Sequence, residues 1–192
     1  MAPHFLTGEE LTAAEQLRLL ERAIELKADR LSSRALEGKS VALVFDKPST
    51  RTRVSFETGV FELGGNPVIL GQDELQMGRG ESARDVALVL SRMVHGIGIR
   101  TGPLETVEQL AEHASVPVVN MLTHDHHPCQ ALADLMTLRE RFGTLEGLKL
   151  AYVGDGNNIA RSLLVAGGLA GVEVAVASPC LLYTSPSPRD RS

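Results

Sequence analysis

The chain alternates between two patterns of apolar and polar positions. Short continuous apolar runs, such as Ser40 to Phe45 (SVALVF), are typical of buried strands, and the stretches between them repeat apolar residues at helical intervals. Thr7 and Glu10 have the spacing of a helix capping box, which predicts a first helix that ends near Ala28. Further strands are predicted at residues 68–70, 96–100, 116–121, 148–153 and 172–177, and further helices at 51–63, 81–93, 104–113, 128–142 and 158–169.

This alternation predicts the α/β fold class, with a parallel sheet covered by helices on both faces. The sequence pattern indicates a domain junction near residues 141–147, where Gly143 and Gly147 lie at the end of a long predicted helix and a new strand begins. We therefore expect a first domain over residues 1–143 and the start of a second, Rossmann-like α/β domain over residues 144–180.

The end of the chain, residues 181–192, differs in kind. It is rich in Ser, Pro and Arg, which is typical of disordered segments. A native flexible tail is one interpretation. The segment also resembles a translated sequencing-adapter read-through, so we expect a non-native tail that takes no part in the fold.

Composition narrows the class of protein. Hydrophobic residues make up 43% and charged residues 22%, as in soluble globular proteins. A net charge of −5 argues against a nucleic acid partner, and no apolar run has membrane-spanning length. Two cysteines give no disulfide framework, and the N-terminus lacks a secretory pattern, so we expect a cytoplasmic protein.

A local arginine cluster can still bind a small anion within an acidic protein. The candidates are Arg51, Arg53, Arg79, Arg84 and Arg100.

The segment Ser49-Thr50-Arg51-Thr52-Arg53 carries the clearest chemistry. It follows a buried strand and opens a predicted helix, where free backbone N–H groups and the helix dipole favour an anion. Its hydroxyls and guanidiniums add donors suited to phosphate oxygens. The alternative is an ordinary helix cap with solvated arginines.

Two further segments carry polar side chains at predicted element ends. Arg100 ends an apolar strand, and ligands of parallel sheets collect beyond the carboxyl ends of strands. His127 and Gln130 share one face at the start of a helix whose first turn contains Pro128. The alternatives are a solvated strand end and a polar helix start. His124 to His127 suggests a metal site, but no second ligand cluster stands elsewhere and we expect no metal. Nothing marks Cys129 as an activated nucleophile.

Residues 45–57 (FDKPSTRTRVSFE) resemble the phosphate-binding signature of the aspartate/ornithine carbamoyltransferase family, and residues 127–130 resemble its His-Pro-x-Gln motif. The resemblance covers residues 6–179. It implies that Ser49, Thr50, Arg51 and Thr52 hold the phosphate of carbamoyl phosphate, and that Arg53 is structural. It also implies that Thr52, Arg100 and His127 reach the carbonyl oxygen and Gln130 the amino group, with Pro128 and Cys129 among the ligand-binding residues.

Two segments resemble the ornithine branch of this family. Gln76 stands in a glycine-containing loop where the aspartate branch has a lysine, and the resemblance places this loop in the active site of a neighbouring subunit. The turn from Gly154 to Asn158 lacks the three-glycine dinucleotide fingerprint. It resembles the Gly-Asp-x-x-Asn segment in which Asn158 would bind ornithine.

The resemblance implies an enzyme that transfers the carbamoyl group of carbamoyl phosphate to L-ornithine, giving L-citrulline and phosphate, as in arginine biosynthesis. It implies no cofactor and a homotrimer or a multiple of one. Aspartate, putrescine and an acylated ornithine are alternative acceptors. Two later family segments, Asp-x-x-x-Ser-Met-Gly and His-Cys-Leu-Pro, do not occur in the chain. We therefore expect that the chain is cut short in its second domain and is inactive by itself. The alternative for this chain is a non-catalytic anion-binding domain.

Overall fold

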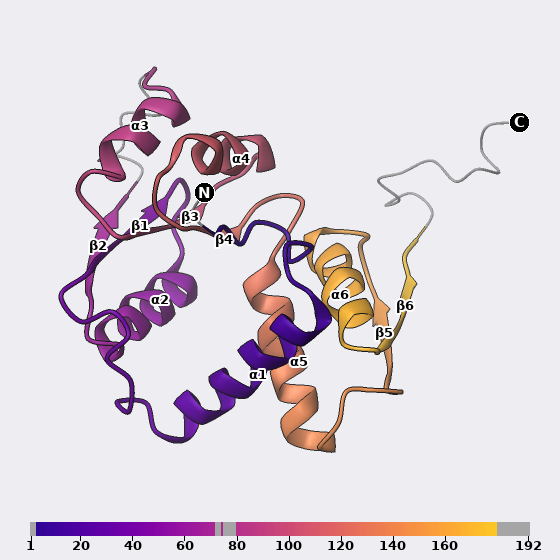
Figure 1. Ribbon diagram of the computed structural model, residues 1–192. Helices are drawn as coiled ribbons and strands as arrows, with labels where there is room; N and C mark the ends of the chain where they lie inside the picture. The colour runs from indigo at the N-terminus through magenta and orange to yellow at the C-terminus, as the bar shows by residue number, and fades with distance from the viewer. Residues whose placement is uncertain (1–2, 72–73, 75–79, 180–192) are drawn as a thin grey trace, which may run out of the picture.

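A four-stranded parallel sheet forms the first part of the molecule (Figure 1). The structure, a computed structural model, describes residues 3–71, 74 and 80–179. The strands run in the order β2-β1-β3-β4, so two crossovers return the chain to opposite sides of β1. Their bounds are β1 (Ser40–Phe45), β2 (Asn66–Leu70), β3 (Gly96–Arg100) and β4 (Val118–Leu122).

Helices cover both faces of this sheet. Helices α3 (Ala83–Leu90) and α4 (Leu104–His113) lie on one face, where their apolar side chains pack against Ala42, Val44, Ile97 and Ile99. On the other face, Phe56 of α2 (Thr50–Glu62) packs against a smaller cluster of Leu43, Phe45 and Met121. The predicted α/β class with a parallel sheet between helices is confirmed.

A second apolar core joins the two ends of the chain. Helix α1 (Ala13–Ala28), α5 (Pro128–Phe142) and α6 (Asn158–Leu169) pack together over the two-stranded parallel sheet of β5 (Lys149–Val153) and β6 (Glu173–Ala177). Gly143 ends α5 in the left-handed region, at φ 78°, as a glycine cap does. The core nevertheless continues across this point, because Leu135 of α5 and Leu163 of α6 belong to one cluster. The domain division at residue 143 therefore stays a prediction.

The first helix begins later than predicted. Its cap is Thr12, whose hydroxyl accepts a hydrogen bond from the backbone N–H of Glu15 while the Glu15 carboxylate accepts one from the N–H of Thr12. Thr7 and Glu10 form a turn instead, in which the Glu10 carboxylate accepts hydrogen bonds from consecutive backbone N–H groups. The capping-box prediction had the right spacing at the wrong threonine.

The outer face of the β5–β6 sheet is open to solvent. Side chains alternate along both strands, and Leu150, Tyr152 and Val174 face α6 while Val153 on the opposite face is 82% exposed. Within the described ranges, no helix combines the length and apolar character that crossing a membrane requires. Gln76 and the predicted tail at residues 181–192 lie outside the described residues.

Candidate functional site

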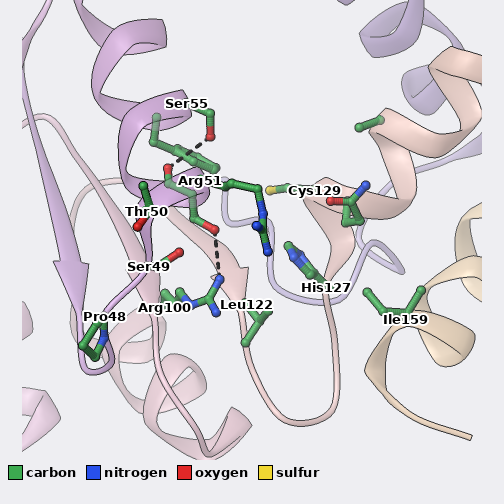
Figure 2. Close-up of a pocket in the computed structure, with 14 residues that line it drawn as sticks. Pro48, Ser49, Thr50, Arg51, Ser55, Arg100, Leu122, His127, Cys129 and Ile159 are labelled. Atoms are coloured by element: carbon green, nitrogen blue, oxygen red, sulfur yellow. Dashed lines mark hydrogen bonds between the residues drawn. The ribbon is translucent and has the colours of Figure 1, made fainter. Parts of the chain in front are cut away.

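A cavity of about 680 Å³ opens at the carboxyl edge of the four-stranded sheet (Figure 2). Three strand ends lead into it: the turn after β1, Arg100 at the end of β3, and Leu122 at the end of β4. The first turns of α2 and α5 form its walls, and Ile159 of α6 closes one side. The seven residues predicted to converge all line this cavity: Ser49, Thr50, Arg51, Thr52, Arg100, His127 and Gln130.

The start of α2 presents its backbone N–H groups to the cavity without a side-chain cap. Ser49 takes the cap position in extended conformation, at φ −153° and ψ 110°, but its hydroxyl makes no capping hydrogen bond. The first N–H groups of a helix have no acceptor within the helix, so those after Ser49 are available to a ligand. A helix start whose N–H groups lack a side-chain acceptor attracts an anion, which disfavours the interpretation of this segment as an ordinary helix cap.

The two guanidiniums of the cavity differ in how firmly they are held. Arg100 Nη1 donates a hydrogen bond of 2.9 Å to Thr52 Oγ1, which fixes both side chains while leaving the threonine proton free for a ligand. Arg51 makes no hydrogen bond or ion pair with any described residue, and Figure 2 shows its guanidinium extending into the cavity. Arg53 lines a separate cavity of about 260 Å³, and its Nε lies 3.6 Å from Glu57 Oε2.

His127 stands at the cap position of α5 with its ring beside Arg100 (Figure 2). Burial, and then the positive charge of Arg100, lower the pKa of His127 to about 4, so the ring is neutral near pH 7. Its Nδ1 is buried and has no hydrogen-bond partner among the described residues. A buried N–H without a partner is costlier than an unpaired acceptor, so the ring proton belongs on Nε2. The ring is thereby a neutral hydrogen-bond donor.

Gln130 completes the wall with an amide one turn into α5. Its Nε2 donates a hydrogen bond of 2.9 Å to Asp134 Oδ1, an orientation assigned from this contact. The carbonyl end of the amide is then free to accept hydrogen bonds, which suits the amino group of a ligand. The cavity therefore offers cationic donors at α2, donors at Arg100 and His127, and an acceptor at Gln130.

Comparison with known proteins agrees with this chemistry. Residues 3–140 match the family model described as the carbamoyl-phosphate-binding domain of aspartate/ornithine carbamoyltransferases. The chain belongs to the aspartate/ornithine carbamoyltransferase family. It is 57% identical over 180 residues to an ornithine carbamoyltransferase of Acidothermus cellulolyticus, which covers 93% of this chain and 58% of that protein.

Solved structures of the same family have the same fold. The ornithine carbamoyltransferase of Thermus thermophilus superposes with a TM-score of 0.90 at 47% identity, covering 98% of this chain and 66% of that one. That of Pyrococcus furiosus superposes at 0.89 with 48% identity, covering 93% and 58%. The chain spans little more than half the length of the curated relatives it matches.

Other residues predicted from the family motifs lie less directly on the cavity. Pro128 is buried below the first turn of α5 and is not part of the wall, whereas Cys129 is. Burial raises the pKa of the Cys129 thiol to about 12, so it is protonated and unsuited to act as a nucleophile. Asn158 donates from Nδ2 to the carbonyl oxygen of Thr123 at 2.7 Å and does not line the cavity.

Sequence reasoning missed part of the wall and its support. Leu122 and Ile159 line the cavity, and Ser162 of α6 contacts the backbone of His127 from behind. Ser162 is the one polar residue of the otherwise apolar run 162–170, and this position was the only sign in the sequence of its role. Among the residues that the structure describes, no group of three or more His, Cys, Asp or Glu side chains could hold a metal ion.

Proposed function

We propose that the chain binds carbamoyl phosphate in this cavity, and that the protein transfers the carbamoyl group to the δ-amine of L-ornithine, giving L-citrulline and phosphate. The observation that supports it is the convergence of Ser49 to Thr52, Arg100, His127 and Gln130 on one cavity. These residues come from three segments that lie far apart in the sequence, so only the fold brings them together. The roles below are parts of this proposal.

The phosphate lies at the start of α2. Two hydroxyls, of Ser49 and Thr50, and the free N–H groups of the first turn donate to its oxygens. Arg51 supplies the fork-shaped guanidinium that matches two phosphate oxygens, and it is free to do so because no described residue pairs with it.

The carbonyl oxygen lies between Thr52, Arg100 and His127. The hydrogen bond between Arg100 and Thr52 holds two of these donors in place before the ligand arrives. His127 adds a neutral donor at Nε2. Donors fixed in advance around a developing oxyanion contribute about 3 kcal/mol each to the barrier reduction.

The reaction is a direct acyl transfer without a cofactor. The neutral amine of the acceptor attacks the carbonyl carbon and forms the new C–N bond, while the oxygen receives the displaced electron pair. When the carbonyl reforms, the C–O bond to phosphate breaks and phosphate leaves with that bond's electrons. The amine nitrogen passes one proton to an oxygen of the departing phosphate, and Gln130 holds the carbamoyl amino group throughout through its amide oxygen.

Ornithine is the proposed acceptor, with Asn158 as its ligand on this chain, and Gln76 is proposed as a further carbamoyl phosphate-binding residue. Ornithine carbamoyltransferases among the relatives support the choice. Asn158 lies at the first turn of α6, one residue before the cavity-lining Ile159. The alternatives are aspartate, putrescine and an acylated ornithine.

We also propose a homotrimer, or a multiple of one, in the cytoplasm, serving arginine biosynthesis. Val54 and Phe61 are seven residues apart on α2, and their side chains are 56% and 69% exposed. An exposed apolar stripe of this kind favours a protein partner. The free thiol of Cys129 fits a reducing compartment. Sedimentation analysis of the purified protein tests the trimer.

Binding is tested by calorimetric titration of residues 1–179 with carbamoyl phosphate, inorganic phosphate and sulfate. Preference for carbamoyl phosphate is expected, because Arg100, His127 and Gln130 recognise the carbamoyl end. Equal affinity for all three anions would support the non-catalytic anion-binding alternative instead.

Turnover is tested on residues 1–179 joined to the remaining C-terminal part of the Acidothermus cellulolyticus relative. Citrulline should form from ornithine, and an Arg100→Ala variant should lose this activity. Carbamoyl-aspartate as the main product would refute ornithine as acceptor while leaving the carbamoyl phosphate site intact.

A further inference from the structure

Helix α6 contacts the loop that carries His127 through one of its faces. Asn158, Arg161 and Ser162 are spaced by three and four residues, which places them on the same side of the helix. Asn158 Nδ2 donates to the Thr123 carbonyl oxygen at 2.7 Å. Arg161 Nη1 lies 3.0 Å from Asp125 Oδ1, and the hydroxyl of Ser162 accepts a hydrogen bond of 2.8 Å from the backbone N–H of His127.

The contact from Ser162 is more buried than the Arg161–Asp125 contact, and it differs from both neighbouring contacts in its partner. Ser162 is 1% exposed, whereas the Arg161 and Asp125 side chains are 47% and 40% exposed. Its partner is the N–H of a helix-cap residue, which has no acceptor within α5. A buried N–H without an acceptor is destabilising, so this hydrogen bond fixes where the backbone of His127 lies.

The ring of His127 depends on this anchor because it has none of its own. Its Nδ1 has no hydrogen-bond partner among the described residues. Histidines that act through one ring nitrogen are usually oriented by a hydrogen bond at the other. Within the part of the chain that the structure describes, the ring is placed only by packing and by the backbone from which it extends.

We propose that Ser162 is a positioning residue for His127: by accepting the hydrogen bond of its backbone N–H, it holds the ring where Nε2 meets the carbamoyl oxygen. The inference rests on the proposed function, since it assumes that His127 contacts the carbamoyl group. It adds a link between the cavity and α6, which lies beyond the predicted domain division.

The test compares affinities for carbamoyl phosphate and inorganic phosphate in the whole chain by calorimetry. Ser162→Ala should weaken carbamoyl phosphate binding by about threefold to tenfold, the loss expected for one hydrogen bond. Phosphate binding should be unchanged, because the start of α2 does not involve Ser162. Ser162→Thr keeps the hydroxyl and should retain the wild-type ratio of the two affinities. Arg161→Ala removes the neighbouring exposed contact and should also leave the ratio unchanged.

A double variant separates positioning from general structure. If Ser162 acts through His127, Ser162→Ala should cost nothing further in a His127→Ala background. Equal losses of carbamoyl phosphate and phosphate binding in Ser162→Ala, or additive losses in the double variant, would overturn the inference. Failure of the wild-type chain to prefer carbamoyl phosphate over phosphate would instead refute the proposed function.

Discussion

The sharpest test of the phosphate site compares two arginines two residues apart on α2. Arg51 lines the 680 Å³ cavity and pairs with no described residue, so its charge is available to a ligand. Arg53 lines a different cavity and lies beside Glu57, with 3.6 Å between Arg53 Nε and Glu57 Oε2. Replacing each with alanine removes the same charge from the same helix, and only the direction of the side chain differs.

The expected losses follow from the contacts that each side chain can make. A hydrogen bond to a charged group contributes about 1.5–3 kcal/mol, and a guanidinium can form two to one phosphate. Arg51→Ala should therefore weaken carbamoyl phosphate binding by about 3 kcal/mol, or about 100-fold in the dissociation constant. Arg53→Ala loses only an exposed ion pair, so its effect should stay below about 0.5 kcal/mol.

Calorimetric titration with carbamoyl phosphate at one fixed ionic strength measures both variants, since salt screening alters such affinities. Thermal unfolding serves as the control for folding, and the midpoint of Arg51→Ala should match that of the wild type because Arg51 pairs with none of the residues that the structure describes. Small and equal losses in the two variants would refute the assignment of the phosphate to the start of α2. A larger loss in Arg53→Ala would move the ligand to the neighbouring cavity.

Three further predictions address the rest of the molecule. An NMR titration should give His127 a pKa of about 4 rather than 6.5. Between these two pH values the unfolded chain binds more protons than the folded one. The contribution of His127 to the free energy of unfolding should therefore fall as the pH drops from 6.5 to 4 and stay constant below pH 4. In a Cys180→Ser background, Cys129 should react with a thiol reagent at pH 8 only as fast as the protein unfolds, because burial raises its pKa to about 12; rapid reaction in the native state would contradict this. Gly167→Ala should destabilise the protein in urea by about 1–3 kcal/mol, because the new Cβ would lie 2.5 Å from a valine methyl on β6. Gly168→Ala, with nothing within 4 Å, should stabilise it by about 0.5–1 kcal/mol.

The sheet was predictable because its central strands, β1 and β3, are mostly buried on both faces. Continuous apolar runs such as Ala42 to Phe45 are typical of strands in a covered parallel sheet, and these four residues are at most 5% exposed. The start of α1 was not predictable from spacing alone, since Thr7–Glu10 and Thr12–Glu15 have the same spacing. Gly8 decides between them: its φ of 98° is incompatible with a helix, so the chain turns there before α1 begins.

The convergence of the site was predictable for a related reason. Arg100 ends β3 and the segment after Phe45 follows β1, and the carboxyl ends of strands in one parallel sheet share an edge. The contacts of α6 could not be predicted in this way. Ser162 and Asn158 each contact a residue 35 positions earlier, and only the packing of α6 against α5 brings them there.

The charges around the cavity support the proposed binding of a dianion by an acidic protein. The chain has a net charge of −5, yet the described residues that line the cavity include Arg51 and Arg100 and no carboxylate. Two guanidiniums balance a phosphate dianion, and Arg100 helps to keep His127 uncharged. A protonated ring would add a third positive charge beside Arg100 and would bring the phosphate toward the place that the carbonyl must occupy. A neutral ring still donates a hydrogen bond without competing for the phosphate. The low pKa of His127 therefore supports the proposed arrangement, in which the phosphate lies at one end of the cavity and the carbonyl at the other.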